Sequence, residues 1–121
     1  MKRALILLLP IIAVAGLATA CRPPAAPPPS CPAVIVQTFA PVGQSAQACQ
    51  VAWHESRWDP NARNASGASG WFQLMIPLHS DLIAACPFLW RSAFDGPCNA
   101  WAALQLYLGE GGWYPAWRGA I

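Results

Sequence analysis

The stretch that decides the fold is WHESRWDPNARNASGASGWFQL, residues 53–74. It sets one glutamate, Glu55, among tryptophans in a chain with only 10% charged residues. A helix is predicted to carry Glu55. It should end before the Asp-Pro pair at residues 59–60, because a residue that precedes proline avoids the helical conformation. Glu55 is therefore predicted to lie in the last turn and to face the interior or a cleft. Apolar side chains at helical spacing predict this helix over residues 44–57, with Glu55 on the same face: Ala48, Val51 and Ala52.

The rest of the chain predicts an α+β fold that is mostly α, with a small β element. The run NASGASG forms turns readily, because its glycines can adopt positive φ, and a short hairpin is expected around residues 64–72. Asp95 precedes Gly-Pro-Cys-Asn and is expected to start a helix. Further helical segments are expected from residue 34 to a break at 41–43, over residues 78–89, and over residues 100–108.

The chain begins with the pattern of a secretory signal. Two positive residues precede an apolar run over residues 5–17, and small residues follow at 18–20. The apolar run is short for a membrane span and contains a proline. The predicted organisation is a signal peptide over residues 1–20, a proline-rich linker over 21–32 and one folded domain over 33–121.

Cys21 would become the first residue after cleavage, an arrangement that resembles a bacterial lipoprotein signal. Its lipidation would anchor the exported protein to the membrane at the cell envelope. Position 18 is Ala where lipoprotein signals usually have Leu, and ordinary signal peptidase would accept the same site. A periplasmic or secreted protein therefore remains the alternative.

The cysteines lead to a related prediction. Five are present, an odd number for an exported protein, and a lipid on Cys21 would leave four for two bridges. Three pairings are possible for these four. We favour Cys31–Cys49 and Cys86–Cys98, because each closes a loop that is local in sequence.

Charge and histidine content argue against two classes of partner. Without the two positive residues of the leader, five basic residues face five acidic ones, and no basic patch for a nucleic acid is visible. The pair His54-Glu55 begins a zinc-protease HExxH motif, but the second histidine is replaced by Trp58. Neither a metal site nor a cofactor is expected.

Several motifs in order resemble the signature of the soluble lytic transglycosylase family, whose fold is lysozyme-like. They are Glu55-Ser56-Arg57, Pro60, Ala62 and the run from Gly67 to Met75, with downstream pieces at residues 94–103 and 112–117. The family ending QLMP-x-T differs here, since the chain reads QLMIPLH at residues 73–79 and is one residue longer. His79, near the place of the family's threonine, is expected to cap or pack a helix rather than to touch substrate.

The resemblance implies cleavage of the β-1,4 bond between N-acetylmuramic acid and N-acetylglucosamine in peptidoglycan. Glu55 matches the catalytic glutamate of the family. The resemblance further implies that Ser56 supports this glutamate and that Gln73 lines the sugar-binding groove.

The aromatic residues suggest how such a site would be built. A carboxyl group that donates a proton at neutral pH needs apolar, desolvated surroundings, because these disfavour its charged form. Trp90 and Trp101 are interpreted as core residues. The aromatic residues predicted to bind substrate are Trp71, Phe72, Trp113 and Tyr114, and Trp58 and Trp117 offer further flat faces for stacking on sugar rings.

The reaction type depends on a second carboxylate. Glycosidases usually use two, whereas a lytic transglycosylase needs one, because the sugar's own 6-hydroxyl replaces water. The other candidates, Asp59, Asp81, Asp95 and Glu110, have no convincing catalytic setting, which favours the transglycosylase. A hydrolase of the same fold (muramidase) remains an alternative. So does a non-catalytic, peptidoglycan-binding lipoprotein that spans the envelope, similar to small phage lipoproteins of lysis.

Overall fold

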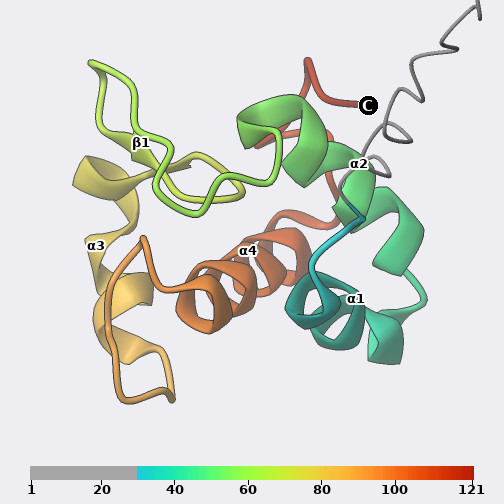
Figure 1. Ribbon diagram of the computed structural model, residues 1–121, viewed down its shortest axis with the longest axis horizontal. Helices are drawn as coiled ribbons and strands as arrows, with labels where there is room; N and C mark the ends of the chain where they lie inside the picture. The colour runs from blue at the N-terminus through green and yellow to red at the C-terminus, as the bar shows by residue number, and fades with distance from the viewer. Residues whose placement is uncertain (1–29) are drawn as a thin grey trace, which may run out of the picture.

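The computed structural model describes residues 30–121 (Figure 1). The predicted signal peptide, Cys21 and most of the linker lie outside the described residues. The fold is α+β and mostly α, as predicted. Its elements in chain order are α1 (Ala33–Phe39), the 3-10 helix η1 (Ala40–Val42), α2 (Ser45–Ser56), β1 (Ala68–Ser69), β2 (Leu74–Met75), α3 (Ile76–Ala85) and α4 (Gly96–Glu110).

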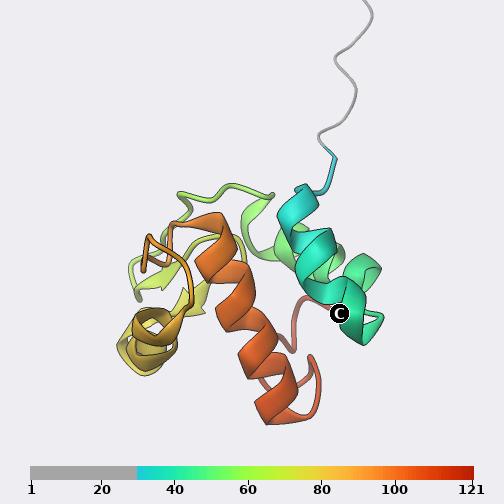
Figure 2. The same cartoon turned by 90° about the horizontal axis from the view of Figure 1, so that it is seen from below.

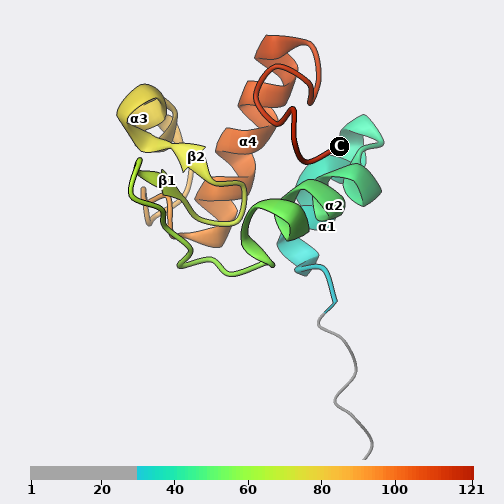
Figure 3. The ribbon, with the colours of Figure 1, turned by 90° about the horizontal axis from the view of Figure 1, so that it is seen from above.

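Helix α4 lies in the middle of the domain and separates two flanks. Helices α1 and α2 lie on one side of it, and the small hairpin and α3 lie on the other (Figures 2 and 3). The strands pair antiparallel, with Ala68 opposite Met75 and Ser69 opposite Leu74. The segment after α4 turns back, so that the C-terminus lies beside α2 (Figure 3).

Helix α2 ends where the sequence predicts. Arg57 and Trp58 both adopt positive φ, 55° and 60°, and terminate the helix just before the Asp-Pro pair. Asp59 then holds a turn, since its Oδ1 accepts a hydrogen bond from the Asn61 backbone N–H at 2.9 Å.

The predicted bounds of α3 and α4 are only partly right. Helix α4 begins at Gly96 because the Asp95 side chain accepts a hydrogen bond from the Cys98 N–H at 3.1 Å, which confirms Asp95 as a helix-start residue. The prediction that α3 reaches residue 89 is wrong. Cys86 is extended at ψ 140° because it precedes Pro87, so the helix ends at Ala85.

The aromatic core lies between α1, α4 and the C-terminal segment. Phe39 stacks on Trp113 at a ring-centroid distance of 5.1 Å and lies 5.6 Å from Phe72. Trp101 is half-buried and packs against this core. The prediction of a core position for Trp90 is wrong, because it follows the end of α3 in a surface loop and is 70% exposed.

Both predicted disulfides are present. Cys31–Cys49 joins the segment before α1 to α2, and Cys86–Cys98 joins the end of α3 to the first turn of α4. No helix within residues 30–121 has the length and apolar character needed to cross a membrane.

Candidate active site

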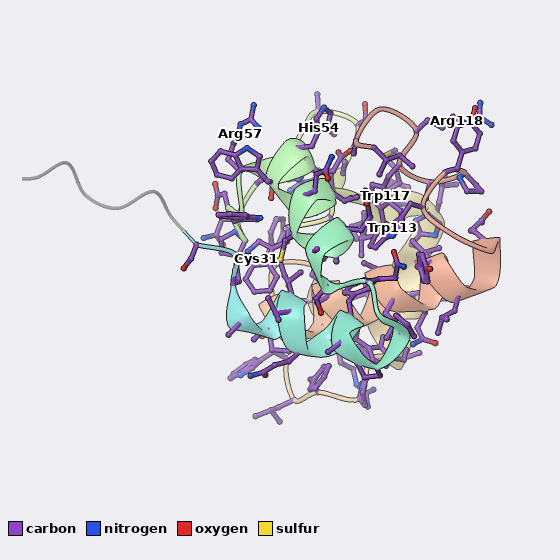
Figure 4. All side chains as sticks on the ribbon, turned by 90° about the vertical axis from the view of Figure 1, so that its right-hand side faces the viewer. Cys31, His54, Arg57, Trp113, Trp117 and Arg118 are labelled. Carbon is purple, nitrogen blue, oxygen red and sulfur yellow. A yellow bond between two sulfur atoms is a disulfide. The ribbon has the colours of Figure 1, made fainter. Side chains whose placement is uncertain are left out.

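Glu55 occupies the last turn of α2, as predicted, and its side chain is 25% exposed. It therefore lies neither in the core nor in open water. The Nδ1 atom of His54 is 3.8 Å from Glu55 Oε1, and the His54 side chain is 56% exposed. Figure 4 shows His54 and Arg57 at the outer end of α2, pointing away from the body of the domain. Sequence reasoning considered His54 only as part of a metal motif.

Ser56 ties the end of α2 to the hairpin. Its Oγ lies 2.8 Å from the Trp71 carbonyl oxygen and 3.0 Å from the Ala52 carbonyl oxygen. The hydroxyl has one proton to donate, so these two acceptors share it. The helix turn that carries Glu55 is thus fixed against the segment between β1 and β2.

Two tryptophans reinforce the same junction through their indole N–H groups. Trp71 Nε1 donates to the Trp58 carbonyl oxygen at 3.1 Å, and Trp58 Nε1 donates to the Cys49 carbonyl oxygen at 2.9 Å. These bonds connect the hairpin to the loop after α2, and that loop back to the middle of α2. The setting of Glu55 is therefore held by side chains on both sides of it.

Gln73 has a positive φ of 46°, which is uncommon for a residue other than glycine. Its Nε2 donates to the carbonyl oxygens of Ala62 and Gly70, both at 3.0 Å, and so closes the loop that follows α2. Gln73 also lines a pocket of about 210 Å³ together with His79 on α3. His79 lies at a kink in α3 rather than at its cap.

Positive φ at residues other than glycine is concentrated here within the described chain. Arg57 and Trp58 follow Glu55 directly, and Gln73 is the third such residue. Strained backbone of this kind persists where surrounding contacts enforce it, and it clusters at functional sites.

Asn99 holds the hairpin in place, and sequence reasoning missed it. Its Oδ1 accepts from the Phe72 N–H at 3.0 Å, and its Nδ2 donates to the carbonyl oxygens of Ser69 and Ala93 at 3.1 and 2.8 Å. Gly70 passes so close that a Cβ would collide with Asn99 and the Ala93 carbonyl. The available signal was an asparagine among the small, buried residues of α4.

The structure places the predicted aromatic residues unequally. Phe72 is fully buried, which corrects its predicted sugar contact, because a side chain without exposed surface cannot lie against a ligand. Trp71 and Trp113 are 8% and 7% exposed, and Trp113 lies inside the domain with Trp117 (Figure 4). Tyr114 is 63% exposed, with the Arg118 guanidinium over its ring at 5.1 Å. Contact of Trp71, Trp113 and Tyr114 with a sugar stays a prediction.

The other carboxylates are engaged elsewhere or lie on the surface. Asp59 and Asp95 accept the backbone hydrogen bonds described above, and Asp81 and Glu110 are exposed on α3 and at the end of α4. Residues 30–121 contain no group of three or more His, Cys, Asp or Glu side chains placed to hold a metal ion.

Comparison with protein-family models gives a match to the transglycosylase SLT domain over residues 40–110, more than half of the chain. The matched segment contains Glu55, Ser56 and Gln73 and runs from η1 to the end of α4. Neither a curated protein nor a solved structure matches the chain.

Proposed function

Because this chain belongs to the transglycosylase SLT domain family, we propose that it is a lytic transglycosylase that cleaves the glycan strands of peptidoglycan. The bond it would break is the β-1,4 bond between N-acetylmuramic acid and N-acetylglucosamine. The observation that carries the proposal is the position of Glu55. It is partly exposed in the last turn of a helix whose end is tied to the hairpin by Ser56.

One carboxyl group is sufficient for this reaction. Protonated Glu55 donates its proton to the glycosidic oxygen as the bond from that oxygen to C1 of the muramic acid breaks. The resulting carboxylate takes the proton of the muramic acid 6-hydroxyl, whose oxygen bonds to C1. The products are a 1,6-anhydro sugar and a new chain end, and Glu55 regains its proton.

The engaged or surface positions of the other acids support the single-carboxylate route. A two-carboxylate glycosidase places both groups on either side of the scissile bond, about 5–10 Å apart. Asp59 and Asp95 already accept turn and cap hydrogen bonds, and Asp81 and Glu110 are exposed on the surface. In the proposed site, Ser56 and Gln73 act as positioning residues through the hydrogen bonds that fix α2 and the following loop.

Export and lipidation at Cys21 belong to the same proposal. They rest on residues 1–21 of the sequence alone. Expression in a bacterial host should yield a membrane-associated form whose N-terminal peptide carries an acyl mass. A soluble form that starts at an unmodified Cys21 would refute the lipid anchor.

The experiment that tests the enzyme is muropeptide mass spectrometry on purified sacculi. Glu55→Gln keeps the shape of the side chain but cannot deliver a proton, so release of 1,6-anhydro products should fall by about 10²–10⁴-fold. Glu110→Gln is the matched control, since Glu110 is exposed at the end of α4 and should leave activity unchanged.

Three results would contradict the proposal in different ways. Full activity of Glu55→Gln would remove Glu55 from the reaction. Products one water heavier, with reducing ends, would show a hydrolase. A wild type that binds sacculi but releases nothing would show a binding domain.

A further inference from the structure

A second pocket lies on the other face of α3 from Gln73. Leu78 and His79 line the small pocket beside Gln73, whereas Pro77, Ser80 and Ile83 line this larger one. Its volume is about 600 Å³, within the range of roughly 300–1,000 Å³ that is usual for small-molecule sites. The hairpin, α3 and the segment just before α4 line this open recess.

The two described arginines that neither stack on an aromatic ring nor form an ion pair both line this pocket. Of the four described arginines, Arg57 stacks over Trp53 and Arg118 over Tyr114, at 5.0 and 5.1 Å. The other two, Arg63 and Arg91, both line the pocket. Neither forms an ion pair or a side-chain hydrogen bond with any residue of the described chain.

No carboxylate lines the pocket to balance these two charges. Two like charges at one recess repel each other, and a bound anion would relieve that repulsion. The planar guanidinium group is suited to carboxylates and phosphates, because it can donate two parallel hydrogen bonds to either. Two exposed arginines without a carboxylate beside them thus make this lining suited to an anionic group.

The rest of the lining indicates what carries the anion. Ile76, Ile83 and Phe94 give it an apolar wall, and Ser80 and Ser92 add hydroxyl groups. Ser92 Oγ already accepts from the Phe94 N–H at 3.2 Å, so its own proton is free to be donated. A bare inorganic anion would use the arginines but leave the apolar wall without a contact.

We propose that this pocket binds the peptide stem of peptidoglycan, a short peptide with small apolar side chains and free carboxylates. The proposal rests on the proposed function for its choice of peptide. The first turns of α3 separate the pocket from Gln73, so a glycan held beside Gln73 and a stem in the pocket would contact opposite faces of one helix. A flat membrane surface fits a recess less well than an extended peptide does.

Titration calorimetry with the chain carrying Glu55→Gln, which cannot turn over its ligand, tests the proposal. The probes are the GlcNAc–MurNAc disaccharide with its stem peptide, the same disaccharide without the peptide and with its lactyl carboxyl group capped as an amide, and the free peptide. The first should bind about tenfold or more tightly than the second, since a charged hydrogen bond is worth at least that step.

Substitution of the arginines gives the decisive comparison. Arg63→Gln with Arg91→Gln should reduce the affinity for the stem-bearing disaccharide to that of the bare one and leave the bare one unchanged. Glu110→Gln, a charge change at an exposed residue outside both pockets, is the control and should change neither. Equal binding of both disaccharides, or the same loss for both in the double variant, would overturn the proposal.

Two further arms separate the possible failures. Binding of phosphatidylglycerol vesicles or inorganic phosphate but not of the peptide, lost in the double variant, would overturn the peptide assignment. Arginine-dependent peptide binding by a chain that cleaves no glycan would support the pocket and refute the enzyme. If the chain cleaves glycan but binds the disaccharide equally well with and without the stem peptide, the role of the pocket would be refuted and the proposed enzyme supported.

Discussion

The two flanks of α4 are stabilised in different ways. On the α1–α2 side, large apolar residues such as Ile35, Phe39 and Val51 are fully buried. On the hairpin–α3 side, the hairpin places Phe72 and Leu74 in the core, whereas α3 itself buries only Ile83 and is fastened by the Cys86–Cys98 bridge. Large apolar residues of α3 and the loop after it are exposed, with Leu78 at 74% and Leu89 at 87% exposure. Helices α1 and α2 therefore depend mainly on apolar packing, whereas α3 depends more on a covalent bond.

This difference bears on the candidate site, which lies where the two flanks meet. Glu55 comes from the packed flank, whereas Gln73 and the larger pocket belong to the other. Ser56 bonds across the junction to the Trp71 carbonyl. A helix with a buried apolar face thus carries the proposed acid, and the hairpin and α3 provide the surfaces that would meet a ligand.

The largest effect is expected from Phe39→Ala. Phe39 is fully buried and in ring contact with Phe72, Tyr107 and Trp113. Its truncation should lower the free energy of unfolding by about 3–5 kcal/mol, the lost transfer energy plus the cost of a cavity. Denaturant unfolding followed by circular dichroism measures this.

Val36→Ala is the matched control on the same helix. Val36 is 39% exposed, so its truncation should cost less than about 1 kcal/mol. Similar losses for the two variants would show that α1 is not the packed element described above.

An intermediate effect is expected from removal of the Cys86–Cys98 bridge. Both cysteines are fully buried and separated by 12 residues. Cys86→Ala with Cys98→Ala should lower the free energy of unfolding by about 2–4 kcal/mol. Hydrogen exchange should show lost protection in α3 but not in α1 and α2.

Cys31→Ala with Cys49→Ala provides the comparison, because that bridge fastens the packed flank. Its loss should loosen the segment before α1 and leave α3 protected. If removing Cys86–Cys98 exposed α1 and α2 as much as α3, the two flanks would behave as one unit and the distinction between them would fail.

The sequence predicts best where a local signal is strong. The bounds of α2 agree within one residue at each end, because helical spacing and the Asp-Pro pair both act locally. The disulfide pairs follow from short loops, and Asp95 from its place before Gly-Pro. Where Cys86 precedes Pro87, the same proline rule ends α3 early, and the apolar run beyond it misled the prediction.

The features of the site that the sequence did not predict depend on tertiary contacts, which no local sequence pattern indicates. Asn99 reaches Phe72 and Ser69, which lie 27 and 30 residues away in sequence, so its role emerges only from the fold. Phe72 stands within a motif that implies a sugar groove, yet the motif does not say which of its side chains turn inward. The sequence likewise does not predict that Arg63 and Arg91 line the same pocket.

The smallest effect is expected from Trp90→Ala. Trp90 is 70% exposed in the loop after α3, so little apolar surface is lost and the free energy of unfolding should change by less than about 0.5 kcal/mol. Trp101→Ala is the control, because Trp101 is half-buried against the core and its truncation leaves a gap there. Thermal and denaturant unfolding should therefore show a clearly larger loss of stability for Trp101→Ala than for Trp90→Ala. If Trp90→Ala were as damaging as Trp101→Ala, the loop would pack on the core in solution. The interpretation of Trp90 as a core residue would then be right, and α3 with the loop after it would depend on aromatic packing as α1 does.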